Sequence, residues 1–326
     1  MMAMLKTLGA RIMSVVLSLV LASAIGASAQ AAAPLLYVTN QSAGNVLVID
    51  TGSDAKVATL EVAPGPAMIA ASPSGRRLYI THPETGQISI LDGQALGRPR
   101  VIEVSGAPFG IAAAGDGRLF VSDWNRNLLS VLDGETGKTL AEIKVGRAPA
   151  HVALAPHVRR AFVANREDNS ISVVDTERLI VIATVKVGHA PFALAVSPAG
   201  DRVYVANVQS GDISVLNTES LAREGTVRVG AMPYGVAISP GGDRVFVANQ
   251  QSGTVNVVDA ASLVPIHRAK VGRYPESIVM LPDGSKAYVV NWMSGDISVL
   301  DGKTGRDLKR LEAGDGARGL VVVPSG

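Results

Sequence analysis

Hydrophobic and polar residues alternate along most of the chain in short runs, and one kind of run recurs seven times. It starts with an aromatic residue, continues with small or β-branched residues and ends on a polar one. Alternation with a period of two predicts a β-strand. The copies begin 41 or 42 residues apart, at Tyr37–Asn40, Tyr79–His82, Phe120–Asp123, Phe162–Asn165, Tyr204–Asn207, Phe246–Asn249 and Tyr288–Asn291.

Three further alternating runs accompany each copy. The second ends in Asp or Asn, as in Ile171–Asp175, and the third usually ends in Val-Gly, as in Ile182–Val187. The fourth follows a proline, as in Pro191–Val196. Four short strands per repeat, separated by turn residues, are typical of a propeller blade. The sequence therefore predicts an all-β fold, a seven-bladed β-propeller of four-stranded blades.

The order of the strands predicts how the ring closes. If the strand after the proline is strand A and the aromatic strand is strand B, the first repeat begins at B. The chain ends with a strand A at Ala317–Pro324. We therefore expect this C-terminal strand A to join the N-terminal B, C and D strands, which removes an open sheet edge. Residues 30–326 then form one propeller domain.

The repeats resemble a known family. Tyr37–Asn40 reads Y-V-T-N, and the G-x-x-P, S-P-x-G-x-R and D-T segments around the copies are similar to YVTN-type β-propeller repeats. The resemblance covers essentially the whole chain after the leader. It implies the propeller scaffold and a kinship with extracytoplasmic binding proteins, amine dehydrogenase heavy subunits and propellers associated with PQQ-dependent oxidation systems.

The first 29 residues have a different composition. Lys6 and Arg11 precede an apolar run, which is followed by Ala27-Ser28-Ala29. This order is typical of a secretory signal peptide. We expect residues 1–29 to be removed by cleavage after Ala29 or within the next four residues, which predicts a periplasmic or secreted protein with no membrane span after cleavage.

Charge and cysteine content restrict the function classes. The chain has 30 Lys and Arg against 28 Asp and Glu, and both leader charges are basic, so 28 of each sign remain after cleavage. The mature protein therefore lacks the global positive field that attracts nucleic acid. There is no cysteine, which excludes a thiolate nucleophile and a C-x-x-C-H haem attachment.

The A–B and C–D connections lie at one end of such a propeller. Basic residues recur there before strand B, and acidic residues recur after strand C, in nearly every repeat. Because the same residue types recur in successive blades, we interpret them as stabilising the turns rather than as an anion-binding ring.

The D–A and B–C connections lie at the other end, the D–A/B–C face, where the repeats differ from one another. Aromatic and arginine side chains exposed together are typical of recognition surfaces. The sequence therefore predicts that this face binds a protein partner or a small ligand through Phe109, Trp124, Arg126, Arg147, Phe192, Tyr234, Arg273, Tyr274, Trp292 and Arg318. Arg166 and Glu276 lie at the same end.

A metal site is a second hypothesis for this face. The final position of strand B is His82 in the second repeat and Asp123 in the third, and His151 lies near the start of strand A in the next blade. Imidazole and carboxylate groups are ligands for zinc and other transition metals. The spacing matches no known metal motif.

We identify no catalytic residues in the sequence and expect no cofactor other than this metal ion. The first functional hypothesis is an extracytoplasmic, non-enzymatic binding or scaffold propeller, acting as a monomer. The alternative, implied by the family resemblance, is an accessory or non-catalytic subunit of a periplasmic quinoprotein dehydrogenase system of the PQQ or amine type. A groove for single-stranded nucleic acid is a further alternative, against which the balanced charge counts.

Overall fold

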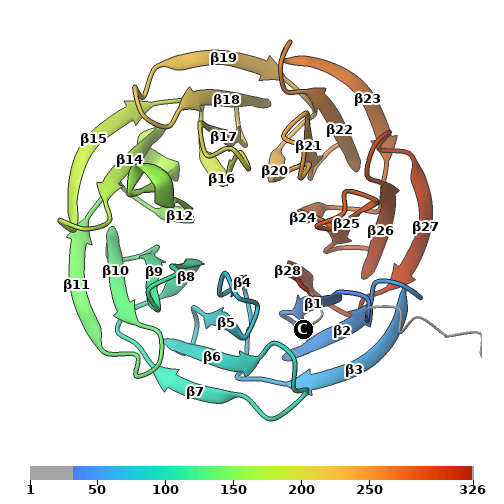
Figure 1. Ribbon diagram of the computed structural model, residues 1–326, viewed down its shortest axis with the longest axis horizontal. Helices are drawn as coiled ribbons and strands as arrows, with labels where there is room; N and C mark the ends of the chain where they lie inside the picture. Colours follow the sequence, from blue (N-terminus) through green and yellow to red (C-terminus); the bar gives the residue numbers. More distant parts are fainter. Residues whose placement is uncertain (1–31, 325–326) are drawn as a thin grey trace, which may run out of the picture. The chain divides into compact units, whose positions relative to one another are not determined.

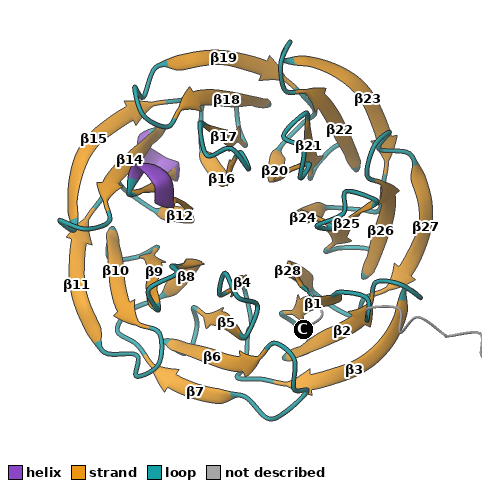
Figure 2. Cartoon of the chain, in the orientation of Figure 1, coloured by secondary structure: helices purple, strands orange, loops and turns teal. Residues whose placement is uncertain are grey.

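The computed structural model describes residues 32–324, and the predicted signal peptide lies outside the described residues. Within residues 32–324 the chain forms seven antiparallel four-stranded sheets arranged as blades around a central axis (Figure 1). The predicted seven-bladed propeller is confirmed. Apart from strands and turns, this part of the chain contains only two short 3₁₀ turns, Pro156–Val158 and Arg166–Asp168 (Figure 2).

Each blade is ordered A-B-C-D from the axis outward (Figure 1). The A strands are β28 (Ala317–Val323), β4 (Ile69–Ala71), β8 (Pro108–Ala113), β12 (Pro149–Ala155), β16 (Pro191–Val196), β20 (Pro233–Ile238) and β24 (Pro275–Met280). The B strands are β1 (Leu35–Asn40), β5 (Arg77–His82), β9 (Arg118–Asp123), β13 (Arg160–Asn165), β17 (Arg202–Asn207), β21 (Arg244–Asn249) and β25 (Lys286–Asn291).

The C strands are β2 (Asn45–Asp50), β6 (Gln87–Asp92), β10 (Leu128–Asp133), β14 (Ser170–Asp175), β18 (Asp212–Asn217), β22 (Thr254–Asp259) and β26 (Asp296–Asp301). The D strands form the rim and are β3 (Ala55–Glu61), β7 (Arg100–Glu103), β11 (Thr139–Lys144), β15 (Ile180–Lys186), β19 (Arg223–Arg228), β23 (Val264–Lys270) and β27 (Asp307–Glu312).

The aromatic residues of the B strands form the core between blades. Tyr37, Phe120 and Phe162 are fully buried, and so are their counterparts in the later blades. The strands on either side supply Val, Ile, Leu and Ala to the same layers. Burying both faces of the B and C strands in this way makes neighbouring blades depend on one another.

Several basic residues at the start of strand B bond to the turns, and some of these bonds connect successive blades, whereas the repeated pattern predicted only that they stabilise the turns. The Arg118 guanidinium donates from Nη1 to the carbonyl of Thr176, in the C–D turn of the next blade, at 2.6 Å. Arg202 donates in the same way to the Ala260 carbonyl at 2.8 Å. The bond satisfies a turn carbonyl that would otherwise lack a partner, so these residues have a structural role.

The ring closes through the predicted pairing of first and last strands. Strand β28 is antiparallel to β1, with Tyr37 opposite Val321 and Val38 opposite Leu320. At the junction between the last blade and the first, the buried carboxylate of Asp54 accepts from the Nζ atoms of Lys286 and Lys309, each at 2.7 Å, and from the Tyr288 hydroxyl.

Burial by itself raises the pKa of the Asp54 carboxyl, but the hydrogen bonds from Lys286, Lys309 and Tyr288 outweigh it and hold the pKa below its ordinary value. The charged form is therefore the one the folded ring stabilises.

We predict that Asp54→Asn lowers the free energy of unfolding by about 1 to 3 kcal/mol at pH 7, because the amide cannot compensate two ammonium groups. Asn tolerates the left-handed backbone of this position, where φ is 56°. The pKa of Asp54 is lower in the folded state than in the unfolded state. The difference in unfolding free energy between wild type and Asp54→Asn is therefore complete above the unfolded-state pKa, and it decreases as the pH falls through the folded-state pKa.

Urea unfolding at several pH values measures this effect. Asp133→Asn, which changes a half-buried acidic residue in another C–D turn, is the matched control and is expected to cost less. An equal loss in both variants would contradict the assignment of Asp54 as a clasp between the last and first blades.

Candidate functional site

Each strand A, or the residue just before it, directs one large side chain toward the central channel. Two adjacent positions are involved, the first and second residues after the proline that precedes or begins strand A, or after Ala317 in the closing strand. Where the first is large, the second is small, as in Phe109–Gly110, Phe192–Ala193, Tyr234–Gly235, Glu276–Ser277 and Arg318–Gly319. Where the first is alanine, the second is large, as in Ala67–Met68 and Ala150–His151.

Close packing between neighbouring A strands explains the small residues. A Cβ atom added to Gly110 would lie 2.1 Å from the carbonyl oxygen of Ala150, in the next blade, and one added to Gly235 would lie 2.5 Å from that of Glu276. The ladder between strands A and B is irregular at the same place in most blades, which is typical of a bulge that redirects a side chain.

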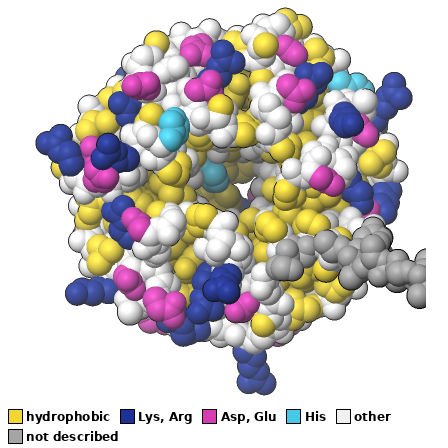
Figure 3. Space-filling view, in the orientation of Figure 1, with side chains coloured by type: hydrophobic (Ala, Val, Ile, Leu, Met, Phe, Trp, Pro, Cys, Tyr) yellow, Lys and Arg dark blue, Asp and Glu magenta, His cyan; other side chains and the backbone are white. Residues whose placement is uncertain are grey.

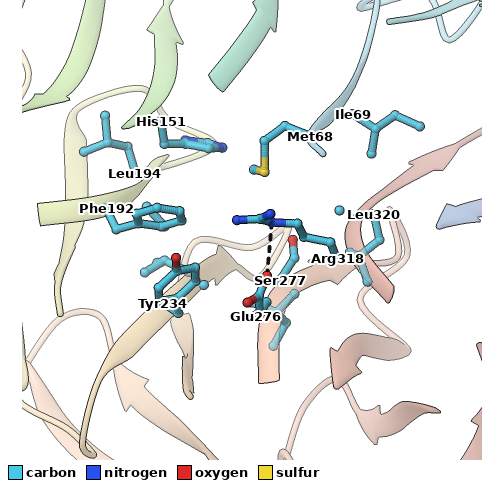
Figure 4. Close-up of a pocket in the computed structure, with 15 residues that line it drawn as sticks. Met68, Ile69, His151, Phe192, Leu194, Tyr234, Glu276, Ser277, Arg318 and Leu320 are labelled. Atoms are coloured by element: carbon cyan, nitrogen blue, oxygen red, sulfur yellow. Dashed lines mark ion pairs between the residues drawn. The ribbon is translucent and has the colours of Figure 1, made fainter. Parts of the chain in front are cut away.

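The channel holds a small cavity of about 170 Å³. The space-filling view shows the ring hollowed at its centre, with hydrophobic atoms around the opening (Figure 3). Among the groups that line the cavity are Met68, His151, Phe192, Tyr234, Glu276 and Arg318, which point into it from six different blades (Figure 4).

Glu276 and Arg318 form an ion pair across the cavity wall. Arg318 Nε lies 3.3 Å from Glu276 Oε2 (Figure 4). The second carboxylate oxygen of Glu276 and a terminal nitrogen of Arg318 have hydrogen-bond partners. Gln250 donates to Glu276 Oε1 at 2.9 Å, and Arg318 Nη1 donates to Gln41 Oε1 at 2.6 Å. Arg318 Nε and Glu276 Oε2 are close enough to attract but make no hydrogen bond, and both atoms are buried. The pair therefore keeps one free donor beside one free acceptor.

Burial shifts the ionisable groups of the cavity toward their neutral forms. It raises the pKa of Glu276, against the opposing effects of the Arg318 charge and the Gln250 hydrogen bond. It lowers the pKa of His151 to about 4, so this imidazole is neutral at neutral pH. His151 Nδ1 is buried without a hydrogen-bond partner.

Four aromatic side chains form a continuous cluster beside the cavity. The Phe109 ring lies edge-on to Trp124 at 5.3 Å and to Phe192 at 5.8 Å, and Phe192 lies 4.0 Å from Tyr234 between ring centroids. Arg166 lies over Trp124 and Phe192 at 5.9 and 6.0 Å. Such contacts stabilise the wall.

The remaining aromatic residues predicted for this face form a separate group. Tyr274 and Trp292 lie 6.4 Å apart in the last blade. Trp292 is 37% exposed and Met293 beside it 45%. The predicted surface is thus divided into a channel cluster and an exposed patch.

Most of the predicted arginines serve the loops that carry them. Arg126 pairs with Glu142 at 2.8 Å and Arg147 with Asp168 at 2.7 Å. Arg273 donates to the Met293 carbonyl at 3.4 Å. Of the arginines predicted for the face, Arg318 is the one that lines the cavity.

The predicted metal ligands do not come together. His82 is bound within its own blade to the Pro64 carbonyl at 3.0 Å and the Ser89 hydroxyl at 2.8 Å. Asp123 accepts from two backbone N–H groups of its own turn, whereas His151 faces the channel. Within residues 32–324 no group of three or more His, Asp or Glu side chains is placed to hold a metal ion. Strand B ends point into the blade, which is why the proposed trio is not formed.

Glu276 was placed at this end of the propeller but not among the predicted binding residues, and Met68 was not predicted; for Glu276 a signal existed. When the A strands are aligned on the proline, Glu276 and Arg318 are the two charged residues at the position that is Phe, Tyr or Ala in the other blades. No comparable signal identifies Gln41 and Gln250, because glutamines are common in such loops.

Comparison with known proteins identifies a family. A family model described as outer membrane protein assembly factor BamB (PQQ_2) matches residues 42–311. No curated protein matches the chain. No helix within residues 32–324 is long and apolar enough to cross a membrane.

Solved structures of similar shape include enzymes. The periplasmic gluconolactonase of Pseudomonas aeruginosa is 19% identical, with a TM-score of 0.77 over 90% of this chain and 99% of that one. Hydrazine synthase of Kuenenia stuttgartiensis is also 19% identical, with a TM-score of 0.73 over 82% and 92%. A 6-phosphogluconolactonase assigned in Bacteroides fragilis is 15% identical, with a TM-score of 0.77 over 89% and 98%. At these identities the likeness concerns the fold alone.

His82 gives a prediction for acid stability. Burial lowers its pKa, against the opposing hydrogen bonds to the carbonyls of Pro64 and Ala63. A neutral ring with its proton on Nδ1 donates to Pro64 and accepts from Ser89. Because the folded pKa is depressed, the stability contributed by neutral His82 is present above the unfolded pKa and declines as the pH falls below about 6.5.

In other blades an asparagine occupies the position of His82, and a glycine lies beside it. Glycine is needed there because a Cβ on Gly146, for example, would approach the Asn165 carboxamide to 2.5 Å. We therefore predict that, when the pH is lowered from 7.5 to 5, the free energy of unfolding of Ala63→Gly/His82→Asn falls by about 1 kcal/mol less than that of the wild type. Chemical denaturation at both pH values measures this. Ala63→Gly alone, the control, should keep the wild-type acid sensitivity; an unchanged loss in the double variant would refute the role of His82.

Proposed function

We propose that this propeller binds a small ligand in its central channel without transforming it. The premise is that the chain belongs to the PQQ_2 family, described as outer membrane protein assembly factor BamB. The signal-peptide pattern of residues 1–29 supports an extracytoplasmic location. The family assignment supports the scaffold, and the ligand site is inferred from the residues of the channel.

The main support for this proposal is the hydrogen-bond donor and the acceptor without partners in the cavity wall. An unsatisfied buried polar atom costs roughly 1–3 kcal/mol, more when it is charged. Glu276 Oε2 and Arg318 Nε are both such atoms, and both belong to residues that line the cavity. A ligand that hydrogen-bonds to them would recover this energy on binding.

Binding is favoured over catalysis by the surroundings of the two candidate bases. Activation of a nucleophile requires a base in hydrogen-bond reach of it. Within residues 32–324, the side-chain hydrogen bond of Glu276 comes from Gln250, and His151 Nδ1 has no partner. Neither base is hydrogen-bonded to a protein hydroxyl group that could attack a substrate.

The test is a substitution that fills the cavity. Ser277 lines it and occupies the second position of the pair, so Ser277→Met places a larger side chain in the cavity, and the variant is used only if its thermal unfolding matches that of the wild type. Small sugars, hydroxy acids and phenols are screened by ligand-observed NMR. We expect at least one to bind the wild type and to lose binding at least tenfold in Ser277→Met.

Ser74→Met, an exposed residue at the opposite end, is the control and should bind as the wild type does. Ligands that bind equally to wild type and Ser277→Met lie outside the channel, and that result would refute the proposal.

A second candidate function, docking of a protein partner, is supported by the exposed patch of Trp292 and Met293 beside the half-buried Tyr274. A quinoprotein or cytochrome subunit is the partner that the resemblance to dehydrogenase systems implies. Exposed Trp and Met next to Arg273 are typical of interface hot spots.

The two surfaces can be tested independently, because Trp124 belongs to the channel cluster and Trp292 to the patch. Trp292→Ala is predicted to abolish co-purification of a partner from the native host, with a loss of at least tenfold. Trp124→Ala should leave that partner bound. Recovery of the same partner with Trp292→Ala would rule out the patch.

A further inference from the structure

The size of the channel cavity limits what it can hold. Its volume is about 170 Å³, and an engineered apolar cavity of about 150 Å³ binds benzene. The cavity therefore accommodates one six-membered ring with a small substituent. Larger ligands would have to extend out of the channel mouth.

The polar edge of the cavity selects the substituent. Arg318 Nε–H can only donate and Glu276 Oε2, as a carboxylate, can only accept. They lie 3.3 Å apart, each without a hydrogen bond. A hydroxyl group can accept from the one and donate to the other. A carboxylate cannot donate to Glu276, and an ammonium group cannot accept from Arg318.

The charges of the site also favour a neutral molecule. Glu276 and Arg318 compensate one another, and His151 contributes no charge because burial keeps it neutral. Arg166 does not line the cavity; its guanidinium lies over Trp124 and Phe192. An ionic ligand would bring one unbalanced charge into a buried site, which is costly.

The rest of the wall fits the face of a ring. Phe192, Tyr234 and Met68 enter the cavity opposite the ion pair or beside it (Figure 4). Aromatic and thioether groups pack well on a flat ring. One side of the site is thus apolar and the other offers a single donor and acceptor pair.

We infer that the channel ligand is a neutral, single-ring compound with a hydroxyl group, and that this hydroxyl bridges Arg318 Nε and Glu276 Oε2. The inference rests on the proposed function and specifies its ligand. Both a saturated ring and an aromatic ring that carry one hydroxyl group satisfy this chemistry, and the experiment separates these two sources.

The experiment uses a background with one tryptophan. Trp292→Phe leaves Trp124 as the sole tryptophan of the chain, in contact with the wall residue Phe192. Its fluorescence is titrated with cyclohexanol, phenol, benzoate, benzylamine and toluene. We expect at least one of the two hydroxylated rings to bind at least tenfold more tightly than benzoate, benzylamine and toluene.

Charge variants then test the role of the pair. Glu276→Gln leaves Arg318 uncompensated, so benzoate should gain at least tenfold relative to the neutral ring. Arg318→Gln leaves Glu276 uncompensated, so benzylamine should gain instead. The exposed residues Glu312 and Arg306 provide the matched controls Glu312→Gln and Arg306→Gln, which should keep the selectivity of the background. Since Arg318 lies on the closing strand, its variant is compared only if its thermal unfolding matches the background, and Glu276→Gln alone suffices for the test.

The outcomes separate the two proposals. If benzoate, benzylamine or toluene binds best and Ser277→Met abolishes that binding, the ligand class is wrong and the channel site stands. The same holds if Glu276→Gln does not change the selectivity. If none of the five compounds binds, the inferred ligand class is overturned, and the ligand screen with Ser277→Met decides the site separately.

Discussion

The pairing of the last strand with the first is the constraint on which the rest of the structure depends. Without β28, the first blade would lack its strand A and the ring would have an open edge. The pairing also places Arg318, near the C-terminus, beside Glu276 in the neighbouring blade and Gln41 in the first repeat. The same contacts that close the ring therefore complete the channel site, and the site exists only in the closed ring.

The repeat also explains where function can be placed. Residues that recur in successive blades, such as Arg118 and Arg202, are occupied by bonds to the next blade. The large side chains that point into the channel are not needed for these bonds, and neighbouring A strands pack against each other through the small residues of the pairs, such as Gly110 and Gly235. Their side chains can differ from blade to blade at little cost to the scaffold. Seven such positions in one ring give a site whose chemistry can change without changing the fold.

The sequence was sufficient for the fold but only partly for the site. Period-two runs at a spacing of 41 or 42 residues predicted the strands and the closure, because these depend on local pattern and on counting. The same pattern located the D–A/B–C face. It did not separate Trp124 from Trp292, since both follow strand B, and only the three-dimensional arrangement places one against Phe192 and the other against Tyr274. The orientation of His82 and His151 depends on strand pairing and on the bulge in strand A, which a pattern of residue types does not specify.

The ion pair of the channel argues for function on energetic grounds. At the equivalent position Phe192 and Tyr234 lie 4.0 Å apart and stabilise each other by burial and ring contact. The Glu276–Arg318 pair stabilises the fold less. Removing two charges from water costs free energy that offsets much of their attraction, and a pair without a hydrogen bond between its charged groups recovers little of that cost. Apolar side chains in both places would therefore be expected to give an equally or more stable ring. The pair is thus not explained by the stability of the fold, and its unpaired donor and acceptor, on residues that line a ring-sized cavity, give it a role that the rest of the propeller does not require.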